Sequence, residues 1–469
     1  MDKADIPYLS AAELAQLIEK TEVSPVEATE AYLDRIDELD FKFNSYLTVC
    51  RKEALQAAHE AERAIAQGNY LGPMHGIPVG VKDQLWTRGI RSTGGSRFLA
   101  DFVPDEDATA IANLAKAGGI LLGKTVLSEF AITGFTHRFR FPRNPWNLDM
   151  SAGGSSSGSG AATAAFLCAT SLGEDTGGSI RRPSAWDGLV GVRPSWGRVS
   201  RYGVMPGVWS MDTVGPISRT VEDAAITLGA IAGYDPKDPY TWNAPVPDYR
   251  AALDGDIKGI RVGIIAELIN SDQVEPEVRE AVVKASTVLG GLGASVEEIS
   301  IPMTRHANAI GAIPLAVEPA SNQHEWIKNR LEDYGHDNRI GLLTGSIIPA
   351  QAYYKAQKLR TMLRQQVLEA LEKYDVLVSP TSGRVAPRLV QDDPVITSKE
   401  NTGRLPFMLT NTFNLTSAPA VSVPCGFGAR NLPVGLQIGS RSFAEEMILK
   451  VAHAYEQSTP WHTMRPSAV

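Results

Sequence analysis

Short apolar runs alternate with helical patterns along most of this 469-residue chain, and this alternation limits the fold more than any other feature. Residues 79–82 form a short apolar run that ends in a lysine. Residues 108–117, 221–232 and 275–290 have helical spacing, and strand-like runs lie at 120–123, 167–172, 260–265, 295–301, 374–379 and 420–423. Such alternation predicts an α/β fold, a layered sheet with helices on both faces.

The two flanking regions are mainly helical. Helices are expected from about Ser10, from the capping box that begins at Ser24, and over about 52–67. Residues 305–375 also look helical, with one break at about 335–349. No repeat or long linker is present, so we predict a single domain over 1–469. Its parts are N-terminal helices at about 8–68, a core at about 70–230, a helical region at about 305–375 that covers the cleft, and a C-terminal part of the core at 376–469.

Composition argues against several classes of protein. A net charge of −8 argues against a nucleic-acid scaffold, because such proteins usually have a basic surface. Three widely spaced cysteines indicate reduced, buried thiols in a cytoplasmic protein. No signal peptide or membrane-spanning run is visible, and the histidines show no metal-binding spacing. We therefore expect a cytoplasmic protein with no membrane contact, no metal and no cofactor.

A glycine-rich turn at 175–181 (DTGGSIR) can present a serine as a nucleophile. Gly177 and Gly178 allow a tight turn whose N–H groups converge on one point, as an oxyanion hole requires. Ser179 at its end can be exposed. Taken alone, the same residues also fit an ordinary surface turn.

Lys82 is the candidate base, because no histidine lies in or beside these segments. A serine hydroxyl needs a base, and lysine serves only when it is neutral. An ordinary lysine is neutral in only about one part in 2,500 at pH 7. Burial can lower its pKa by roughly 3–5 units, and an apolar strand is a suitable place. The alternative is a strand-end lysine that reaches solvent.

The run 153–159 (GGSSSGS) can connect Lys82 with Ser179, since a serine hydroxyl both donates and accepts hydrogen bonds. A serine between Lys82 and Ser179 can pass the proton along. A flexible Gly/Ser loop is the alternative, although the apolar sequence that follows favours a buried functional loop.

Together these segments resemble the amidase signature family. The run 153–203 is similar to its signature block almost end to end, and 72–83, 123–131, 144–149, 213–224, 374–381 and 432–446 also match its style. One departure is Ser157, where the family usually has glycine. The resemblance implies a large twisted mixed β-sheet sandwiched between helices.

The resemblance also implies a catalytic Ser–cisSer–Lys triad: Ser179 as nucleophile, Ser155 as relay after a cis peptide bond, and Lys82 as base. The oxyanion hole falls on the N–H groups of Thr176, Gly177, Gly178 and Ser179, with Ser156 as a supporting hydrogen-bonding residue. Attack by Ser179 gives an acyl-enzyme, which water then hydrolyses by the same route.

For the substrate, our main expectation is a free amidase that cleaves a C–N bond in a small apolar or aromatic amide, anilide or carbamate, as in urethanases. No nucleic acid is expected, and a homodimer is an option. The alternative is the A subunit of a glutamine-dependent tRNA amidotransferase. Two features count against it: 132–138 is unlike the GSSTEN-like segment of such subunits, and 390–405 has no clear acidic glutamine-binding motif.

Candidate pocket residues follow from the same comparison. Ile132, Gly134 and Phe135 fall in the segment that borders the family's substrate site, and Trp209 and Met211 follow the signature block. Arg181 could bind an acidic substrate. Core packing is the alternative for the apolar residues, and a structural role is the alternative for Arg181.

Overall fold

One mixed β-sheet runs through the molecule. The structure is a computed structural model that describes residues 2–132, 141–389 and 408–469. Within these residues eleven strands pair in the order β1-β3-β2-β6-β8-β7-β12-β13-β11-β9-β10. They are β1 Tyr46–Val49, β2 Pro78–Lys82, β3 Ile120–Thr125, β6 Thr170–Glu174, β7 Val190–Arg193, β8 Val214–Ser218, β9 Arg261–Ile265, β10 Ser295–Ile299, β11 Val376–Pro380, β12 Ala420–Gly428 and β13 Leu432–Gly439. A separate pair joins β4 Arg143–Asn144 to β5 Asn147–Ser151.

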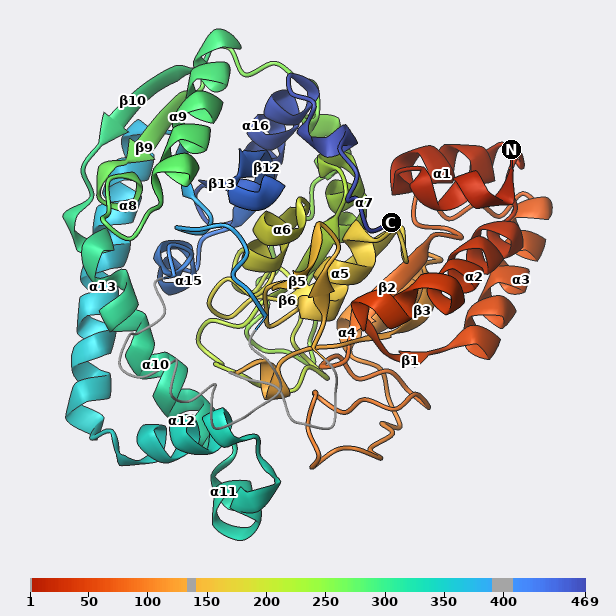
Figure 1. The fold of residues 1–469 in the computed structure, drawn as a ribbon, viewed down its shortest axis with the longest axis horizontal. Coiled ribbons are helices and arrows are strands. Elements are labelled where there is room, and N and C mark those ends of the chain that lie inside the picture. Colours follow the sequence, from red (N-terminus) through yellow and green to blue (C-terminus); the bar gives the residue numbers. More distant parts are fainter. Residues whose placement is uncertain (1, 133–140, 390–407) are drawn as a thin grey trace.

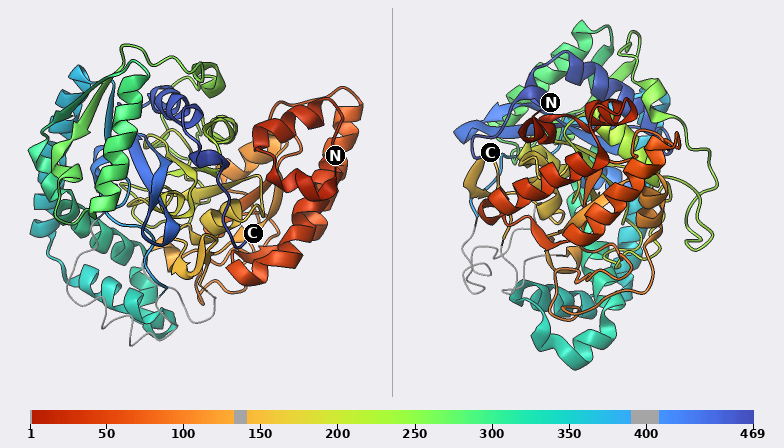
Figure 2. Two further views of the ribbon diagram at one scale, coloured as in Figure 1. Left: turned by 45° about the horizontal axis from the view of Figure 1, so that its top comes forward. Right: turned by 90° about the vertical axis from the view of Figure 1, so that its right-hand side faces the viewer.

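Helices cover this sheet and extend beyond both of its ends (Figure 1). Their bounds are α1 Ala11–Glu19, α2 Pro25–Phe43, α3 Arg51–Ala66, α4 Thr109–Lys116, α5 Ser157–Ala164, α6 Arg181–Asp187, α7 Val221–Ile231, α8 Ala266–Ile269, α9 Pro276–Gly291, α10 Ala307–Asn322, α11 His324–Arg330, α12 His336–Ile347, α13 Ala350–Lys373, α15 Asn411–Thr416 and α16 Glu445–Gln457. The α1–α3 group and the α10–α13 group lie on opposite sides of the molecule, as the views in Figure 2 also show.

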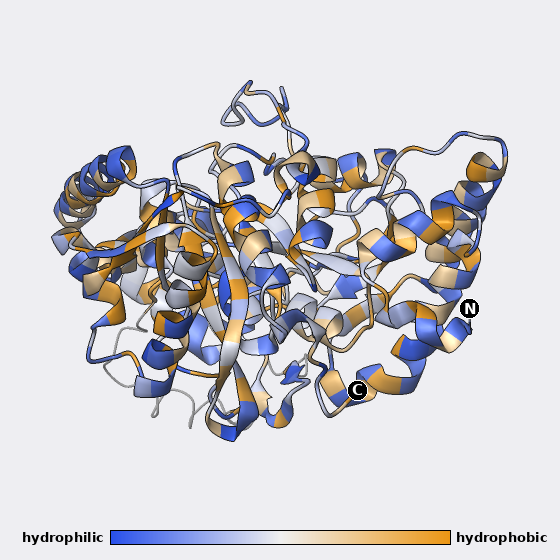
Figure 3. Ribbon diagram, turned by 90° about the horizontal axis from the view of Figure 1, so that it is seen from above, coloured by the Kyte–Doolittle hydropathy of each residue, from blue (hydrophilic) through white to orange (hydrophobic). Residues whose placement is uncertain are grey.

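The middle of the sheet is buried on both faces. Every residue of β2, β6, β7, β8, β11 and β13 is buried. In Figure 3 polar and apolar residues alternate along the outer helices, as expected for helices with one face on the core. The predicted α/β fold with a large mixed sheet between helices is confirmed. In the described residues, no helix combines the length and apolar character needed to cross a bilayer. The single-domain prediction stays a prediction.

Some local predictions were wrong. The break expected at 335–349 is helix α12, because Gly335 and Pro349 bound that helix and do not interrupt it. Inside α12, Gly345 lies so close to α10 that an added Cβ would be 2.0 Å from the Ala316 carbonyl oxygen. Strands β7, β8 and β13 were not predicted. The Gly/Ser run is only partly a loop, since its second half begins α5.

Helix α5 packs directly against neighbouring backbone. A Cβ on Gly158 would lie 2.3 Å from the Ser45 carbonyl oxygen and 2.4 Å from the Val126 nitrogen. The Gly158 N–H donates to the Val126 carbonyl. The start of α5 is therefore held against β3 and its surroundings at a distance that only glycine allows.

We predict that Gly158→Ala destabilises the protein by about 1–3 kcal/mol, because backbone must move to admit the methyl group. The measurement is the free energy of unfolding in urea. Gly341→Ala is the matched control, since Gly341 is also helical but a Cβ there would meet nothing within 4 Å. That change should be neutral or stabilise by up to about 1 kcal/mol. Equal effects at the two positions would contradict the packing argument.

Candidate active site

Lys82 is the last residue of β2 and is fully buried. Its strand lies between β3 and β6, with which it pairs in parallel, so the side chain emerges at the carboxyl edge of the sheet. Lys82 Nζ lies 2.9 Å from Ser155 Oγ, 3.2 Å from the Glu174 carbonyl oxygen and 3.2 Å from Glu174 Oε2. The alternative of a lysine that reaches solvent is excluded.

Burial shifts both charged groups towards neutrality. It lowers the pKa of Lys82, and the nearby Glu174 carboxyl opposes that shift. Burial also raises the pKa of Glu174 to about 7, against the opposing effect of Lys82. Because the groups lie 3.2 Å apart, they titrate as a pair.

Ser155 and Ser156 join the Gly/Ser run to the other two segments. The peptide bond between Gly154 and Ser155 is cis, as the resemblance implied. Ser156 donates its N–H to the Ser179 carbonyl at 3.3 Å and its hydroxyl to the Glu174 carbonyl at 3.2 Å. Ser156 thus fixes the run against both the end of β6 and the nucleophile turn.

The turn 176–179 follows β6 directly. Gly178 has a φ of +110°, and a Cβ there would lie 2.4 Å from Thr410 Oγ1, so this position requires glycine. Ser179 is 6% exposed. Within the described residues its hydroxyl makes no hydrogen bond, and none joins it to Ser155.

The predicted set of oxyanion donors needs one correction. The Gly178 N–H donates to Asp175 Oδ1 at 2.9 Å and is therefore already engaged. The N–H groups of Thr176, Gly177 and Ser179 have no acceptor among the described residues. These are the donors of this turn that remain for an oxyanion.

Asp175 anchors the turn and was not singled out from the sequence. Its fully buried carboxylate accepts from Arg181 Nε at 3.1 Å, Arg193 Nη1 at 3.2 Å and Asn414 Nδ2 at 2.7 Å. Burial alone would raise the pKa of Asp175, but Arg181 and Arg193 hold it well below its usual range. The carboxylate therefore stays charged and ties the turn to α6, β7 and α15.

Glu174 and Asp212 were also missed, although Glu174 and Asp175 form an acidic pair between an apolar strand and a Gly-Gly turn. Thr176 Oγ1 lies 2.7 Å from Glu174 Oε1 and 2.7 Å from Asp212 Oδ1. The acidic pair at the end of a buried strand was the signal that could have identified Glu174, whereas Asp212 has no such local signal.

The predicted pocket residues are only partly supported. Arg181 is fully buried and all five of its N–H groups are used, so it is not available to a substrate. Met211 is fully buried in the main core. Trp209 is 45% exposed and packs with Trp196 and Tyr240 at the surface. Ile132 packs against the cluster of Phe98, Phe130 and Tyr334. Gly134 and Phe135 lie outside the described residues.

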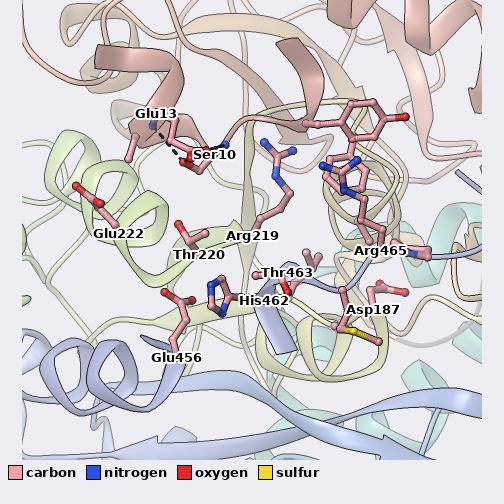
Figure 4. Close-up of a pocket in the computed structure, with 18 of the residues that line it drawn as sticks. Ser10, Glu13, Asp187, Arg219, Thr220, Glu222, Glu456, His462, Thr463 and Arg465 are labelled. Atoms are coloured by element: carbon pink, nitrogen blue, oxygen red, sulfur yellow. Dashed lines mark hydrogen bonds between the residues drawn. The ribbon is translucent and has the colours of Figure 1, made fainter. Parts of the chain in front are cut away.

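A cavity of about 440 Å³ lies elsewhere, between the N-terminal segment, the start of α7 and the C-terminal tail (Figure 4). Ser10, Arg219, Glu456 and His462 are among its lining residues. None of the predicted site residues lines it, so it is separate from the Lys82–Ser155 arrangement. In the described part of the chain, no group of three His, Cys, Asp or Glu side chains is suited to a metal ion.

Comparisons of this chain with a family model, with known sequences and with solved structures agree on one family. The Amidase family model matches residues 27–449. The A subunit of the glutamyl-tRNA(Gln) amidotransferase from Moorella thermoacetica is 40% identical, over 98% of this chain and 99% of that protein. The crystal structure of the corresponding A subunit from Thermotoga maritima is 33% identical with a TM-score of 0.81, over 97% of this chain and 96% of that one. A bacterial aryl acylamidase of the amidase signature family is 27% identical with a TM-score of 0.88, over 97% of both chains.

A family match of this extent agrees with the site. A buried lysine, a serine after a cis peptide bond and a serine in a Gly-Gly turn converge at the end of β2 and β6. The chain therefore belongs to the amidase signature family and is an amidohydrolase that acts on C–N bonds.

Proposed function

We propose that this chain is the amide-cleaving component of an amidotransferase that acts on glutamyl-tRNA(Gln). In that role it hydrolyses the side-chain amide of glutamine, and the ammonia released is used elsewhere in the complex. The single observation that carries the proposal is the 40% identity to an amidotransferase A subunit, over 98% of this chain and 99% of that relative.

This proposal replaces our main expectation from the sequence, which was wrong. A free amidase for small apolar amides, anilides or carbamates, working alone or as a homodimer without nucleic acid, is overturned by end-to-end similarity to a component of an amidotransferase. The relatives compared above are named as amidotransferase subunits and an aryl acylamidase, and these names give no support for carbamate or urethane cleavage. In the proposed complex the partners are other subunits, and a charged tRNA is the final acceptor.

The two short segments that argued against the amidotransferase were given too much weight. Of 132–138 only Ile132 lies within the described residues, and 390–405 lies wholly outside them. Identity spread over nearly the whole chain is broader evidence than two short segments of sequence.

For the chemistry we assign roles as follows. Neutral Lys82 accepts the Ser155 proton while Ser155 accepts the proton of Ser179, whose oxygen attacks the amide carbon. The N–H groups of Thr176, Gly177 and Ser179 stabilise the oxyanion. The proton on Lys82 returns through Ser155 to the leaving nitrogen, which departs as ammonia. Water then attacks the acyl-enzyme and frees Ser179. The 2.9 Å contact between Lys82 and Ser155 and the unengaged N–H groups support these roles.

We predict that the tagged chain, isolated from its own host, co-purifies with partner proteins and releases ammonia from glutamine. Ser179→Ala should lower that release by about 10⁴-fold or more, because the substitution removes the hydroxyl that forms the acyl-enzyme. Mass spectrometry of the purified complex and an ammonia assay are the measurements. A chain that purifies alone, ignores glutamine and cleaves anilides or carbamates would overturn the proposal.

Ser157→Gly is the matched control for that experiment. It lies in the same run as Ser155, but within the described part of the chain its hydroxyl bonds only to the Gly153 carbonyl, at 2.7 Å. The change also restores the residue usual in the family. Activity should stay within about threefold of wild type, since one ordinary hydrogen bond is worth only about 0.5–1.5 kcal/mol.

We also predict that kcat/KM falls by about tenfold per pH unit at acid pH, because protonated Lys82 cannot accept a proton. The midpoint should lie well below about 10.4, the ordinary lysine value, since burial lowers the pKa of Lys82. Lys82→Arg should lower kcat by about 10²–10⁴-fold at every pH, because a guanidinium stays charged. A pH-independent rate, or an active Lys82→Arg variant, would show that Lys82 is not the base.

A further inference from the structure

Thr176 contains one hydroxyl hydrogen but touches two carboxyl groups. Its Oγ1 lies 2.7 Å from Glu174 Oε1 and 2.7 Å from Asp212 Oδ1. One hydroxyl can donate only once, and an ionised carboxylate can only accept. Two hydrogen bonds of this length therefore need a second hydrogen, which one of the carboxyl groups must supply.

Asp212 is the ionised member. Its Oδ2 accepts the Gly207 N–H at 2.9 Å, and its Oδ1 accepts the Val208 N–H at 2.9 Å. Backbone N–H groups that point at both oxygens favour the charged form. Among the described residues no backbone N–H group points at the Glu174 carboxyl: Oε2 contacts Lys82 and Oε1 contacts Thr176. The additional hydrogen thus belongs on Glu174 Oε1.

We infer that Glu174 is held as a neutral carboxylic acid and positions neutral Lys82 for its role as base. The inference rests on the proposed function of Lys82. Glu174 does not touch the reacting atoms, so it is a positioning residue. It adds a fourth member to the Lys82, Ser155 and Ser179 set.

The contacts of Lys82 fit the neutral amine. A neutral amine has two N–H groups and one lone pair. The Glu174 carbonyl oxygen and Oε2, each at 3.2 Å, can only accept, so they take the two N–H groups. The lone pair is left for the Ser155 hydroxyl at 2.9 Å. Each hydrogen then has one acceptor along the chain Ser155, Lys82, Glu174, Thr176 and Asp212.

The charged groups around Glu174 have opposing effects on its ionisation. Lys82 on β2 and Arg193 on β7 favour its ionised form, while Asp212 and the adjacent Asp175 favour its neutral form. Burial disfavours the ionised form and raises the pKa of Glu174 to about 7. An ionised Glu174 would instead hold Lys82 as ammonium, because an opposite charge within about 4–6 Å raises a lysine pKa by 1–3 units.

Infrared spectroscopy at neutral pH tests the protonation directly and needs no substrate. The difference spectrum between wild type and Glu174→Gln should contain the carbonyl band of a protonated carboxylic acid. Its absence, with a carboxylate band in its place, would overturn the inference. This outcome would leave the proposed function standing, because that depends on glutamine hydrolysis and Ser179→Ala.

Two substitutions test the effect on Lys82. Glu174→Gln keeps a neutral acceptor for Lys82 and a donor for Thr176. It should leave the acid midpoint of kcat/KM within about half a pH unit, whereas loss of an ionised partner would lower that midpoint by about 1–3 units. Glu174→Met has similar volume but no acceptor. It should lower kcat by about tenfold or more with KM unchanged, because the proton transfer is no longer aligned.

The comparison of the two variants separates positioning from mere packing. Both variants should be folded and should unfold in a cooperative thermal transition. If Glu174→Met keeps the wild-type kcat, or if Glu174→Gln loses as much kcat as Glu174→Met, the inference fails. A midpoint that falls by a unit or more in Glu174→Gln would show that Glu174 is ionised and also contradicts it.

Discussion

The buried carboxylate of Asp175 is the interaction on which the site depends. It accepts from two arginines, one asparagine and the Gly178 N–H, so a single anion joins the end of β6, the nucleophile turn, α6, β7 and α15. Removing one partner from such a buried network costs about 3–5 kcal/mol in general, since a charge is left unpaired. The turn is therefore held in one shape before any substrate binds, as stabilisation of an oxyanion requires.

The second constraint is the burial of Lys82 beside Glu174. Burial makes a charged lysine costly, and a carboxylic acid in place of a carboxylate removes the partner that would restore that charge. If Glu174 were ionised, it would form an ion pair with charged Lys82, which could not act as a base. Thr176 decides between the ionised and the neutral form of Glu174, because its single hydroxyl hydrogen is donated to Asp212.

Much of this was predictable from the sequence, and the exceptions have physical reasons. Lys82, Ser155 and Ser179 could be put forward as candidates because each lies in a local pattern: an apolar strand, a Gly-flanked serine, a Gly-Gly turn. The structural role of Arg181 could not be predicted, since its partners Asn414 and Gln437 are more than 200 residues away in the chain. Helix α12 was missed because its boundary residues, Gly335 and Pro349, resembled breaks. The function was misjudged because two short segments were given more weight than the rest of the chain.

The central claim is that Ser179 forms the acyl-enzyme after Lys82 removes its proton through Ser155. Mass spectrometry of the protein, quenched during turnover of a slowly deacylated amide, tests it most directly. The account predicts an added acyl mass on the peptide that contains Ser179 in wild type, and none in Lys82→Arg at the same time point. An acyl group on any other residue, or equal labelling of the Lys82→Arg variant, would contradict it.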